Sequence, residues 1–268
     1  MISFPHAKIN LGLSIVSKRQ DGFHNLETIF YPLAIRDALE IIPSNSTKII
    51  LTGLKIGCIS EDNLVLRAFG MVKKNYPSVS HLEIHLHKAI PMGAGLGGGS
   101  SDAAEMILLM NSYFNLQIPA KEMKEFAAEM GSDCSFFLQS DPCFAGGRGE
   151  ILEPIKLDLS GYSIILVHPE IQIETTWAYS RIKPAKPNHD LKESILQPVQ
   201  SWRHLIHNDF ELPVFEEYPQ LRKIKEELYA AGALYAAMTG SGSTIFGIFD
   251  KSELPAIFFA NTRLTIIE

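Results

Sequence analysis

The amino-terminal segment alternates apolar and polar residues with the period of two that a β-strand requires. Every odd position from 9 to 15 is Ile or Leu, so one face of a strand over residues 1–16 is apolar. Lys8 and Asn10 fall on the opposite face. Taken alone, Lys8 is expected at a solvated strand edge.

A hairpin turn is predicted directly after this strand. Asp21-Gly22 is a strong turn signal, because glycine reaches the backbone angles that a two-residue turn needs. Phe23 and His24 begin the returning strand. We expect them to share one surface of the hairpin with Lys8 and Asn10, which raises the prospect of a polar site there.

The same patterns place the remaining elements. Alternation and apolar runs predict strands over residues 23–33, 37–43, 48–52, 81–88, 162–168, 234–238, 244–249 and 264–267. Helical spacing predicts helices over residues 60–72, 100–114, 119–130, 197–209, 215–231 and 253–261. His85 and His87 would point outward from their strand. They lack a carboxylate or cysteine at ligand spacing, so exposed histidines are expected rather than a metal site.

Length and composition predict a soluble globular protein with two cores. The chain has 268 residues, of which 46% are hydrophobic and 20% charged. A boundary near Glu153-Pro154 divides it into predicted domains 1–153 and 154–268. The net charge of −6 argues against a nucleic-acid or membrane surface, while a local basic pocket for phosphates is compatible with it.

Cysteine usage indicates a reducing compartment. Cys58, Cys134 and Cys143 are odd in number and lack metal-ligand spacing. Cys134 is expected to be a small buried residue. Because the sequence shows neither a signal-peptide pattern nor an apolar run of membrane-spanning length, a cytoplasmic location is expected.

Candidate chemistry concentrates in a glycine-rich stretch. Five of the 19 glycines fall within positions 93–99, and an apolar helical pattern follows. Glycine lets a backbone approach a ligand closely, and a loop that feeds a helix N-terminus is a typical phosphate site. We expect such a site here, with Ser100 or Ser101 capping the helix. A flexible linker is less consistent with the flanking Pro91 and the helix.

Two common nucleotide-binding patterns fit this stretch poorly. Gly93-x-Gly95-x-x-Gly98 satisfies the dinucleotide pattern, but the expected acidic residue about 20 positions later is missing. The P-loop pattern fails because no Gly-Lys-Ser/Thr closes the loop. A nicotinamide-linked oxidoreductase, which would bind NAD, is therefore disfavoured.

Two further residues are candidates with simpler alternatives. Asp133 follows a predicted helix end in Gly131-Ser132-Asp133, where an aspartate is more often a cap than a reacting group. It becomes chemically interesting only if it faces the glycine-rich loop. Arg148, in the tight turn 145–150, would either point at a phosphate or pair with Glu150.

Three separated motifs together resemble a known superfamily. They are Pro5-His6-Ala7-Lys8-Ile9-Asn10-Leu11, residues 91–104, and Met238-Thr239-Gly240-Ser241-Gly242-Ser243. This combination resembles the GHMP small-molecule kinases, which include galactokinase, homoserine kinase and mevalonate kinase. With Lys18-Arg19-x-Asp21-Gly22-Phe23-His24-x-Leu26, the chain is most similar to the 4-diphosphocytidyl-2-C-methyl-D-erythritol kinase family. The resemblance spans nearly the whole chain.

The resemblance implies an α+β fold of two domains. The N-terminal domain would be ribosomal-protein-S5-like, the C-terminal domain a ferredoxin-like α/β sandwich, and the active site would lie in the cleft between them. The implied activity is ATP-dependent phosphorylation of the 2-hydroxyl of the methylerythritol part of the substrate. This reaction belongs to the non-mevalonate (methylerythritol phosphate) route to isoprenoid precursors.

The resemblance also assigns residues to roles. Asp133 would be the base or orienting anion, and Lys8 its partner and phosphoryl stabiliser. Asn10, Phe23, His24 and Tyr179 would bind the substrate, with Trp177 as the alternative second aromatic residue. ATP and Mg²⁺ are the implied cofactors, with Ser101 as a candidate Mg²⁺ ligand. The loop that would bind the ATP phosphates comprises Pro91, Met92, Gly93, Ala94, Gly95, Leu96, Gly97, Gly98, Gly99, Ser100 and Ser101.

The chain departs from the family pattern at three positions. Ser135 stands where proline is usual and is expected to loosen the turn that aims Asp133. Asp102 replaces a common asparagine and would add negative charge near the phosphates, although a helix N-terminus favours it. Phe23 replaces a frequent tyrosine, which keeps the ring and loses a hydroxyl.

Two alternatives stay open on the sequence alone. One is another kinase of the superfamily, acting on mevalonate or homoserine. The other is a non-catalytic ligand-binding relative, against which the presence of both Lys8 and Asp133 counts. The expected partner is a small-molecule substrate, with no nucleic acid and no membrane; monomer and homodimer are equally compatible with the sequence.

Overall fold

The computed structural model describes residues 1–54, 63–253, 255, 259 and 262–267. The chain forms two compact units. Unit 1 comprises Met1–Lys8, Pro32–Met92 and Gly97–Asp141, and unit 2 comprises Ile9–Tyr31, Gly93–Leu96 and Pro142–Glu268. Each unit combines separate stretches of the sequence, whereas the predicted domains 1–153 and 154–268 are continuous segments. That division stays a prediction.

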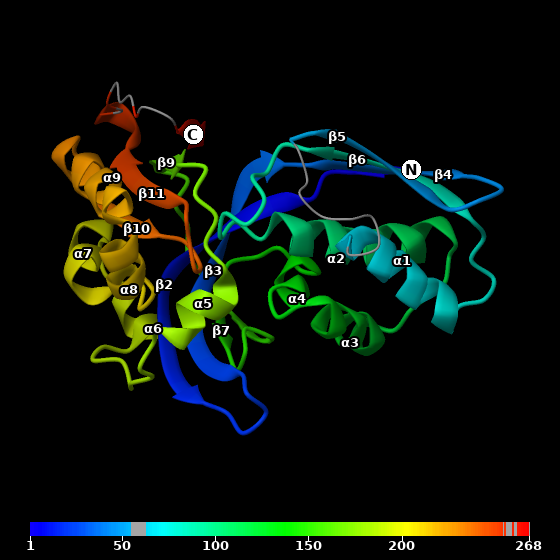
Figure 1. Ribbon diagram of the computed structural model, residues 1–268, viewed down its shortest axis with the longest axis horizontal. Coiled ribbons are helices and arrows are strands. Elements are labelled where there is room, and N and C mark those ends of the chain that lie inside the picture. The colour runs from blue at the N-terminus through cyan, green and yellow to red at the C-terminus, as the bar shows by residue number, and fades with distance from the viewer. Residues whose placement is uncertain (55–62, 254, 256–258, 260–261, 268) are drawn as a thin grey trace. The chain divides into compact units, whose positions relative to one another are not determined.

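Unit 1 is a four-stranded sheet with helices on one face (Figure 1). The strand order is β1 (Ile2–Ser3), β4 (Ala38–Pro43), β6 (Leu82–Lys88) and β5 (Lys48–Gly53). Only the β5–β6 pair is parallel among the described pairs of this sheet. The helices are α1 (Leu64–Asn75), α2 (Gly98–Tyr113), α3 (Ala120–Met130) and the short α4 (Cys134–Phe137).

The strand β6 shows why this sheet forms. Leu82, Ile84 and Leu86 are buried against the helices, as the alternation predicts. His85 and His87 lie on the other face, where they pair with Glu83 at 2.8 Å and Thr52 at 2.9 Å respectively. The prediction of surface histidines is confirmed.

The start of α2 differs from the predicted one. Gly97, not Ser100 or Ser101, occupies the N-cap position, with φ 72° and ψ 12°. A Cβ at Gly97 would lie 2.7 Å from Cζ of Phe137, so only glycine fits this left-handed turn. The helix consequently begins earlier, and the two serines lie inside its first turns.

Unit 2 contains most of two further four-stranded sheets. The first has the order β2 (His6–Lys18), β3 (His24–Arg36), β7 (Cys143–Gly146) and β8 (Ile151–Pro154), and the start of β2 and the end of β3 belong to unit 1. The second has the order β10 (Tyr235–Met238), β11 (Ile245–Asp250), β9 (Tyr162–His168) and β12 (Arg263–Ile267). Gly22, with φ 86°, makes the predicted turn between β2 and β3.

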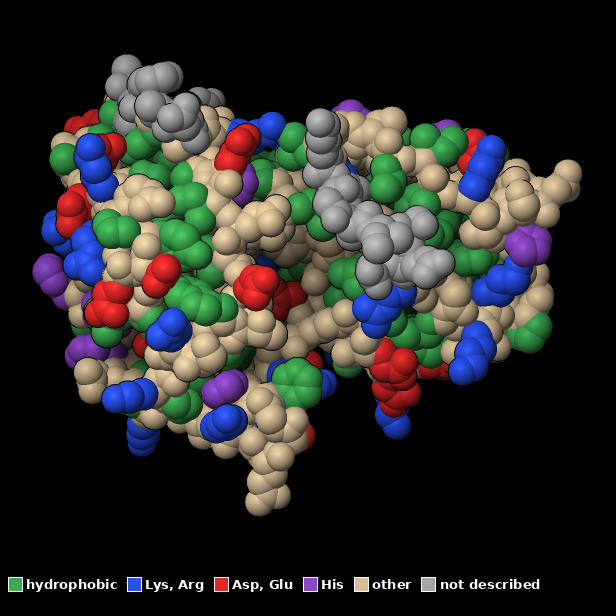
Figure 2. All heavy atoms as spheres, viewed as in Figure 1, with side chains coloured by type: hydrophobic (Ala, Val, Ile, Leu, Met, Phe, Trp, Pro, Cys, Tyr) green, Lys and Arg blue, Asp and Glu red, His purple; other side chains and the backbone are tan. Residues whose placement is uncertain are grey.

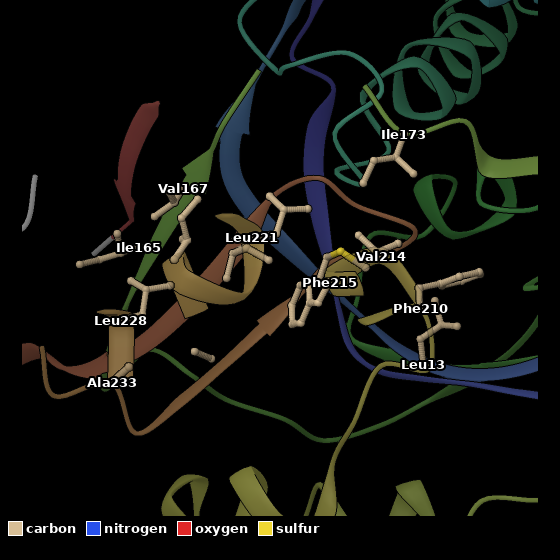
Figure 3. Close-up of a cluster of buried hydrophobic side chains, with 14 of the residues drawn as sticks. Leu13, Ile165, Val167, Ile173, Phe210, Val214, Phe215, Leu221, Leu228 and Ala233 are labelled. Atoms are coloured by element: carbon tan, nitrogen blue, oxygen red, sulfur yellow. The ribbon is translucent and has the colours of Figure 1, made fainter. Parts of the chain in front are cut away.

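Unit 2 also contains helices, some of which pack on its second sheet. They are α5 (Thr175–Ser180), α6 (Leu191–Ser194), η2 (Val199–Ser201), α7 (Trp202–Leu205), α8 (Glu211–Glu217) and α9 (Pro219–Ala230). Figure 3 shows how Leu221 and Leu228 of α9 approach Ile165 and Val167 of β9. All four side chains are fully buried. Their burial forms the core of this sheet.

Two predicted helices are shorter than their patterns. The helix predicted over 215–231 is interrupted at Tyr218. Pro219 restricts the backbone of the residue before it, and Tyr218 adopts φ −123° and ψ 73°. The helix predicted over 197–209 contains only η2 and α7. The start predicted at residues 60–62 and most of the helix predicted over 253–261 lie outside the described residues. Within them, α1 begins after Asn63, whose side chain accepts the N–H of Val65.

The surface carries both signs of charge. Figure 2 shows acidic and basic side chains interspersed over the face it draws. Across the described part of the chain, none of the helices combines the length and the apolar character needed to cross a bilayer.

Candidate functional site

Lys8 and Asp133 form an ion pair in unit 1. Lys8 Nζ lies 3.3 Å from Asp133 Oδ2. Lys8 is 3% exposed, so the expectation of a solvated edge residue is wrong. Its aliphatic chain passes over the glycine-rich loop, where a Cβ at Gly97 would lie 3.2 Å from Lys8 Cε. The lysine is therefore buried beside Gly97, with its ammonium group facing Asp133.

The side chain of Asp133 pairs with Lys8 in the described structure, and its role in a reaction stays a prediction. It precedes α4 at the N-cap position, but its side chain makes no capping hydrogen bond within the described chain. The carboxylate is turned toward Lys8 instead and stays 34% exposed. Ser135 is buried inside α4, so the missing proline does not prevent Asp133 from reaching its partner.

The helix α4 is anchored on both sides. Phe136 and Phe137 are buried, and the Phe137 ring packs where Gly97 lacks a side chain. His6, two residues before Lys8, lies 2.7 Å from Ser140 through Nε2 and 5.2 Å from the Phe137 ring centre. Cys134 is buried as predicted, and burial raises the pKa of its thiol to about 12, so it is inert at neutral pH.

Asn10 lies in a second polar cluster, in unit 2. Its backbone N–H donates to Thr239 Oγ1 at 3.0 Å, and its Nδ2 donates to Thr28 Oγ1 at 2.9 Å. Thr239 Oγ1 also lies 3.0 Å from the carbonyl oxygen of Gly95. The cluster thus fixes the Asn10 amide and ties it to the loop. Thr239 belongs to one of the three motifs, but its contact with Asn10 was not predicted. Nothing in the sequence indicated that Thr28 would join this cluster.

The glycine-rich loop takes a left-handed backbone at every second residue. Gly93, Gly95 and Gly97 have φ of 62°, 76° and 72°. At Gly95 a Cβ would lie 2.0 Å from the carbonyl oxygen of Thr239, so the two backbones are in direct contact. Because Gly97 has no side chain with which to cap α2, the first N–H groups of the helix are suited to an anion.

A buried charged cluster lies in unit 1, beside Gly98 at the start of α2. Lys88 Nζ donates to Asp37 and, at 2.6 Å, to Asp102 Oδ2. All three side chains are almost fully buried. Asp102 therefore points into the interior, where its carboxylate pairs with Lys88, and the expectation that its charge lies near the phosphates stays a prediction. Neither Asp37 nor Lys88 was singled out from the sequence, because only the pairing of distant segments reveals them.

The environment of Asp102 changes its acidity. Burial, together with the neighbouring Asp37 carboxylate, raises the pKa of Asp102 to about 7, against the opposing effect of the Lys88 ammonium group. The acid form of Asp102 is therefore more favoured than that of an exposed aspartate.

The predicted substrate aromatics lie at the turn of the β2–β3 hairpin and on α5. The rings of His24 and Tyr179 are stacked, with centroids 5.0 Å apart and planes at 24°. Trp177 packs on Tyr218 instead, so the structure brings Tyr179 and not Trp177 to His24. Burial, and to a lesser degree the charge of Lys18, lowers the pKa of His24, which favours the neutral imidazole at pH 7.

Phe23 is 52% exposed and has a cation as neighbour. The Arg148 guanidinium lies 4.9 Å from the centre of its ring. Arg148 also pairs with Glu150 at 3.7 Å, which was one of the two expectations for this arginine.

Asn10 and His24 lie at different points along the hairpin. The Asn10 side chain on β2 donates through Nδ2 to Thr28 of β3 at 2.9 Å, and His24 begins β3 four residues before Thr28. At the rise of an extended strand, four residues span roughly 13 Å. The expected sharing of one hairpin surface by Lys8, Asn10, Phe23 and His24 stays a prediction.

A wide pocket elsewhere in unit 2 is a weaker candidate. Its volume is about 930 Å³, and Arg203, Lys225 and Tyr229 are among its lining residues. Lys225 is already paired with Glu211 at 2.6 Å, and Arg203 stacks on Tyr229 at 4.2 Å. The Lys8–Asp133 pair beside Gly97 is the better candidate for chemistry. In the described ranges, no three His, Cys, Asp or Glu side chains gather in a way that could hold a metal ion.

Comparison with known proteins agrees with this geometry. Residues 63–141 match the GHMP kinases N terminal domain, and residues 190–263 match the GHMP kinases C terminal domain. The 4-diphosphocytidyl-2-C-methyl-D-erythritol kinase of Bacteroides fragilis is 49% identical over 257 residues, which cover 94% of this chain and 93% of that protein. The enzyme of the same name from Parabacteroides distasonis is 51% identical over 251 residues, covering 94% and 92%.

Solved structures give the same result. A crystal structure of 4-(cytidine 5'-diphospho)-2C-methyl-D-erythritol kinase superposes with a TM-score of 0.80 at 30% identity, covering 92% of this chain and 90% of that one. Homoserine kinase from Cytophaga hutchinsonii, at 15% identity and a TM-score of 0.66 over 98% and 95% of the two chains, shares the fold alone. The predicted α+β GHMP kinase fold is confirmed. The chain belongs to the 4-diphosphocytidyl-2-C-methyl-D-erythritol kinase family of the GHMP kinases.

Proposed function

We propose that this chain transfers the γ-phosphoryl group of ATP to the 2-hydroxyl of 4-diphosphocytidyl-2-C-methyl-D-erythritol. The observation that carries the proposal is the Lys8–Asp133 ion pair, which lies against Gly97 of the glycine-rich loop. The names of relatives at 49% and 51% identity support the choice of substrate.

In the proposed reaction, the Asp133 carboxylate orients the substrate hydroxyl and accepts its proton. The hydroxyl oxygen then forms a bond to the γ-phosphorus while the bond to the β-phosphate oxygen breaks, and ADP leaves. Phosphoryl transfer depends on positioning and charge stabilisation more than on covalent chemistry. Lys8 meets both needs, because its ammonium holds Asp133 at 3.3 Å and supplies positive charge.

The loop from Pro91 to Ser101 would bind the phosphates of ATP through backbone N–H groups and the start of α2. Mg²⁺ would arrive with ATP and neutralise phosphate charge. Because Mg²⁺ keeps several water ligands and is bound largely through the phosphates that it accompanies, it needs few protein ligands. Ser101 is only 2% exposed, whereas Ser100 is partly exposed and is the better placed hydroxyl.

The cytidine end of the substrate is assigned to the hairpin turn. A neutral His24 offers one donor and one acceptor to the edge of a pyrimidine. Tyr179, which already stacks with the His24 ring, offers an aromatic face, and Phe23 is an exposed ring beside them in sequence.

Asn10 is assigned to the other end of the substrate. It lies two residues from Lys8 on β2, so both side chains leave the strand on the same face. The distance between Asn10 and His24 along the hairpin suits a long substrate, with a nucleoside at one end, an alcohol at the other and a diphosphate between. Both reactants are small soluble phosphates, which fits a cytoplasmic enzyme.

The test is ADP release with Mg-ATP and 4-diphosphocytidyl-2-C-methyl-D-erythritol. Asp133→Asn keeps the size of the side chain and removes its charge and basicity, so kcat should fall by about 10²- to 10⁴-fold. Asp141→Asn, the same change at an exposed position of the same segment, should leave kcat unchanged. Turnover of mevalonate or homoserine in place of this substrate would assign the chain to a different kinase of the superfamily. An Asp133→Asn variant as active as wild type would remove Asp133 from the reaction.

A further inference from the structure

We propose that Asp37, Lys88 and Asp102 are positioning residues that brace both arms of the glycine-rich loop and thereby set the affinity for ATP. The inference rests on the proposed function of that loop. It concerns residues that do not themselves need to touch the nucleotide.

Asp37 holds the arm that leads into the loop. Its carboxylate accepts the backbone N–H groups of Ala89 at 2.6 Å and of Ile90 at 2.8 Å, immediately before Pro91. Asp37 is 1% exposed and lies between β3 and β4, with its own N–H donated to the carbonyl of Pro5. The incoming arm is therefore fixed to the sheet of unit 1 by charge-assisted hydrogen bonds, which are stronger than neutral ones.

Lys88 connects this arm to the one that leaves the loop. Its ammonium donates to Asp37 on one side and to Asp102 Oδ2, at 2.6 Å, on the other. Asp102 belongs to α2, the helix that follows the loop. One lysine thus links the segments before and after the predicted phosphate-binding residues.

The two arms also meet by direct packing. Gly98 is the first residue of α2, and a Cβ there would lie 2.9 Å from Ile90 Cγ2 and 3.2 Å from Lys88 Nζ. The start of the helix therefore rests on the incoming arm at the position of the lysine.

The charges of Asp37, Lys88 and Asp102 depend on one another, so the loss of one side chain should disturb the other two. Two carboxylates share one ammonium group, and Asp102 Oδ1 finds no hydrogen-bond partner among the residues the structure describes. Buried charges persist only where their partners hold them in place. A change at Asp102 should accordingly alter the position of α2 relative to the incoming arm, and with it the first-turn N–H groups that would face the phosphates.

The test measures the KM for each of the two substrates separately. Asp102→Ala removes the acceptor for Lys88 from α2, and we expect the KM for Mg-ATP to rise about tenfold or more, since a hydrogen bond to a charged group is lost. The KM for 4-diphosphocytidyl-2-C-methyl-D-erythritol should stay within about twofold, because nothing in the brace faces that substrate. Asp102→Asn keeps an acceptor of the same shape and should restore the KM for Mg-ATP to within about threefold of wild type. If the alanine variant does not fold, Asp102→Leu fills the same space without an acceptor and replaces it.

The control is a destabilising change elsewhere in unit 1. Val72→Ala opens a cavity in the fully buried face of α1, so it should lower the melting temperature and leave both KM values unchanged. The proposal is overturned if Asp102→Ala changes neither KM, if it raises both equally, or if Val72→Ala raises the KM for Mg-ATP as much. Calorimetric binding of Mg-ADP to the same variants gives the comparison without turnover, so a failure of the proposed reaction is distinguishable from a failure of the brace.

Discussion

Lys8 and Asp133 differ sharply in exposure although they form one ion pair. Lys8 Nζ is 3.3 Å from Asp133 Oδ2, yet the lysine side chain is 3% exposed and the aspartate side chain 34%. The ammonium group is fixed in the interior, while the carboxylate is open to an incoming hydroxyl. This arrangement suits a reaction in which the lysine positions and the aspartate receives a proton.

Lys8→Met should remove the charge and keep the packing of the aliphatic chain. We expect the variant to fold and kcat to fall by about 10²- to 10³-fold, the loss typical for removing one preorganised charge-stabilising group. Asp133 is exposed enough for water to solvate it after the change. Lys121→Met, at an exposed position of α3, is the matched control for steady-state kinetics. Retention of wild-type kcat in Lys8→Met would show that the pair is structural.

Tyr179→Ala should weaken binding of cytidine diphosphate. Stacking of a base on an aromatic ring contributes roughly 1–3 kcal/mol, so the dissociation constant measured by calorimetry should rise about fivefold or more. Tyr179→Phe keeps the ring and should bind as wild type. Trp177→Phe serves as control, because Trp177 packs on Tyr218. A larger loss for Trp177→Phe than for Tyr179→Ala would reverse the assignment of the aromatic residue.

Gly95→Ala and Gly93→Ala should differ strongly although both glycines have positive φ. A Cβ at Gly95 would lie 2.0 Å from the Thr239 carbonyl oxygen, whereas a Cβ at Gly93 meets nothing within 4 Å among the described atoms. Gly93→Ala should therefore cost only the backbone strain, about 1–2 kcal/mol in urea unfolding. Gly95→Ala must also displace a backbone, so it should lose more stability and raise the KM for Mg-ATP. Equal effects of the two variants would contradict the close approach at Gly95.

Asp102 should make the stability of the protein depend on pH. Its pKa is raised from an ordinary 3.8 to about 7 in the folded state, so the folded protein holds this proton more tightly than the unfolded chain. The stabilisation that this protonated group gives the folded protein is therefore complete at acid pH, and it is lost as the pH rises through about 7. In Asp102→Asn, which cannot ionise, this loss is absent.

Urea unfolding of wild type and Asp102→Asn between about pH 5 and 8 tests this dependence. The stability of the variant relative to wild type should increase on the order of 1 kcal/mol per pH unit up to about pH 7 and then level off. A difference that does not change with pH would mean that Asp102 is ionised throughout the range.

Several features of this protein follow from short stretches of sequence. The turn at Asp21-Gly22, the alternation in β6 and the glycine-rich loop are all predicted correctly, because backbone preference and apolar periodicity act between near neighbours. The motifs also predicted the family. The N-cap of α2 is an instructive exception, since serine propensity was overridden by the packing of Phe137 against Gly97.

The functional assignments depend on contacts between segments far apart in the chain. Local sequence favoured a solvated Lys8 and a capping Asp133, and only their meeting across β2 and α4 makes them an ion pair. The same holds for Tyr179 beside His24 and for Lys88 between two buried carboxylates. The energy of a charge or a ring depends on its burial and its partners, and these exist only once the chain has folded.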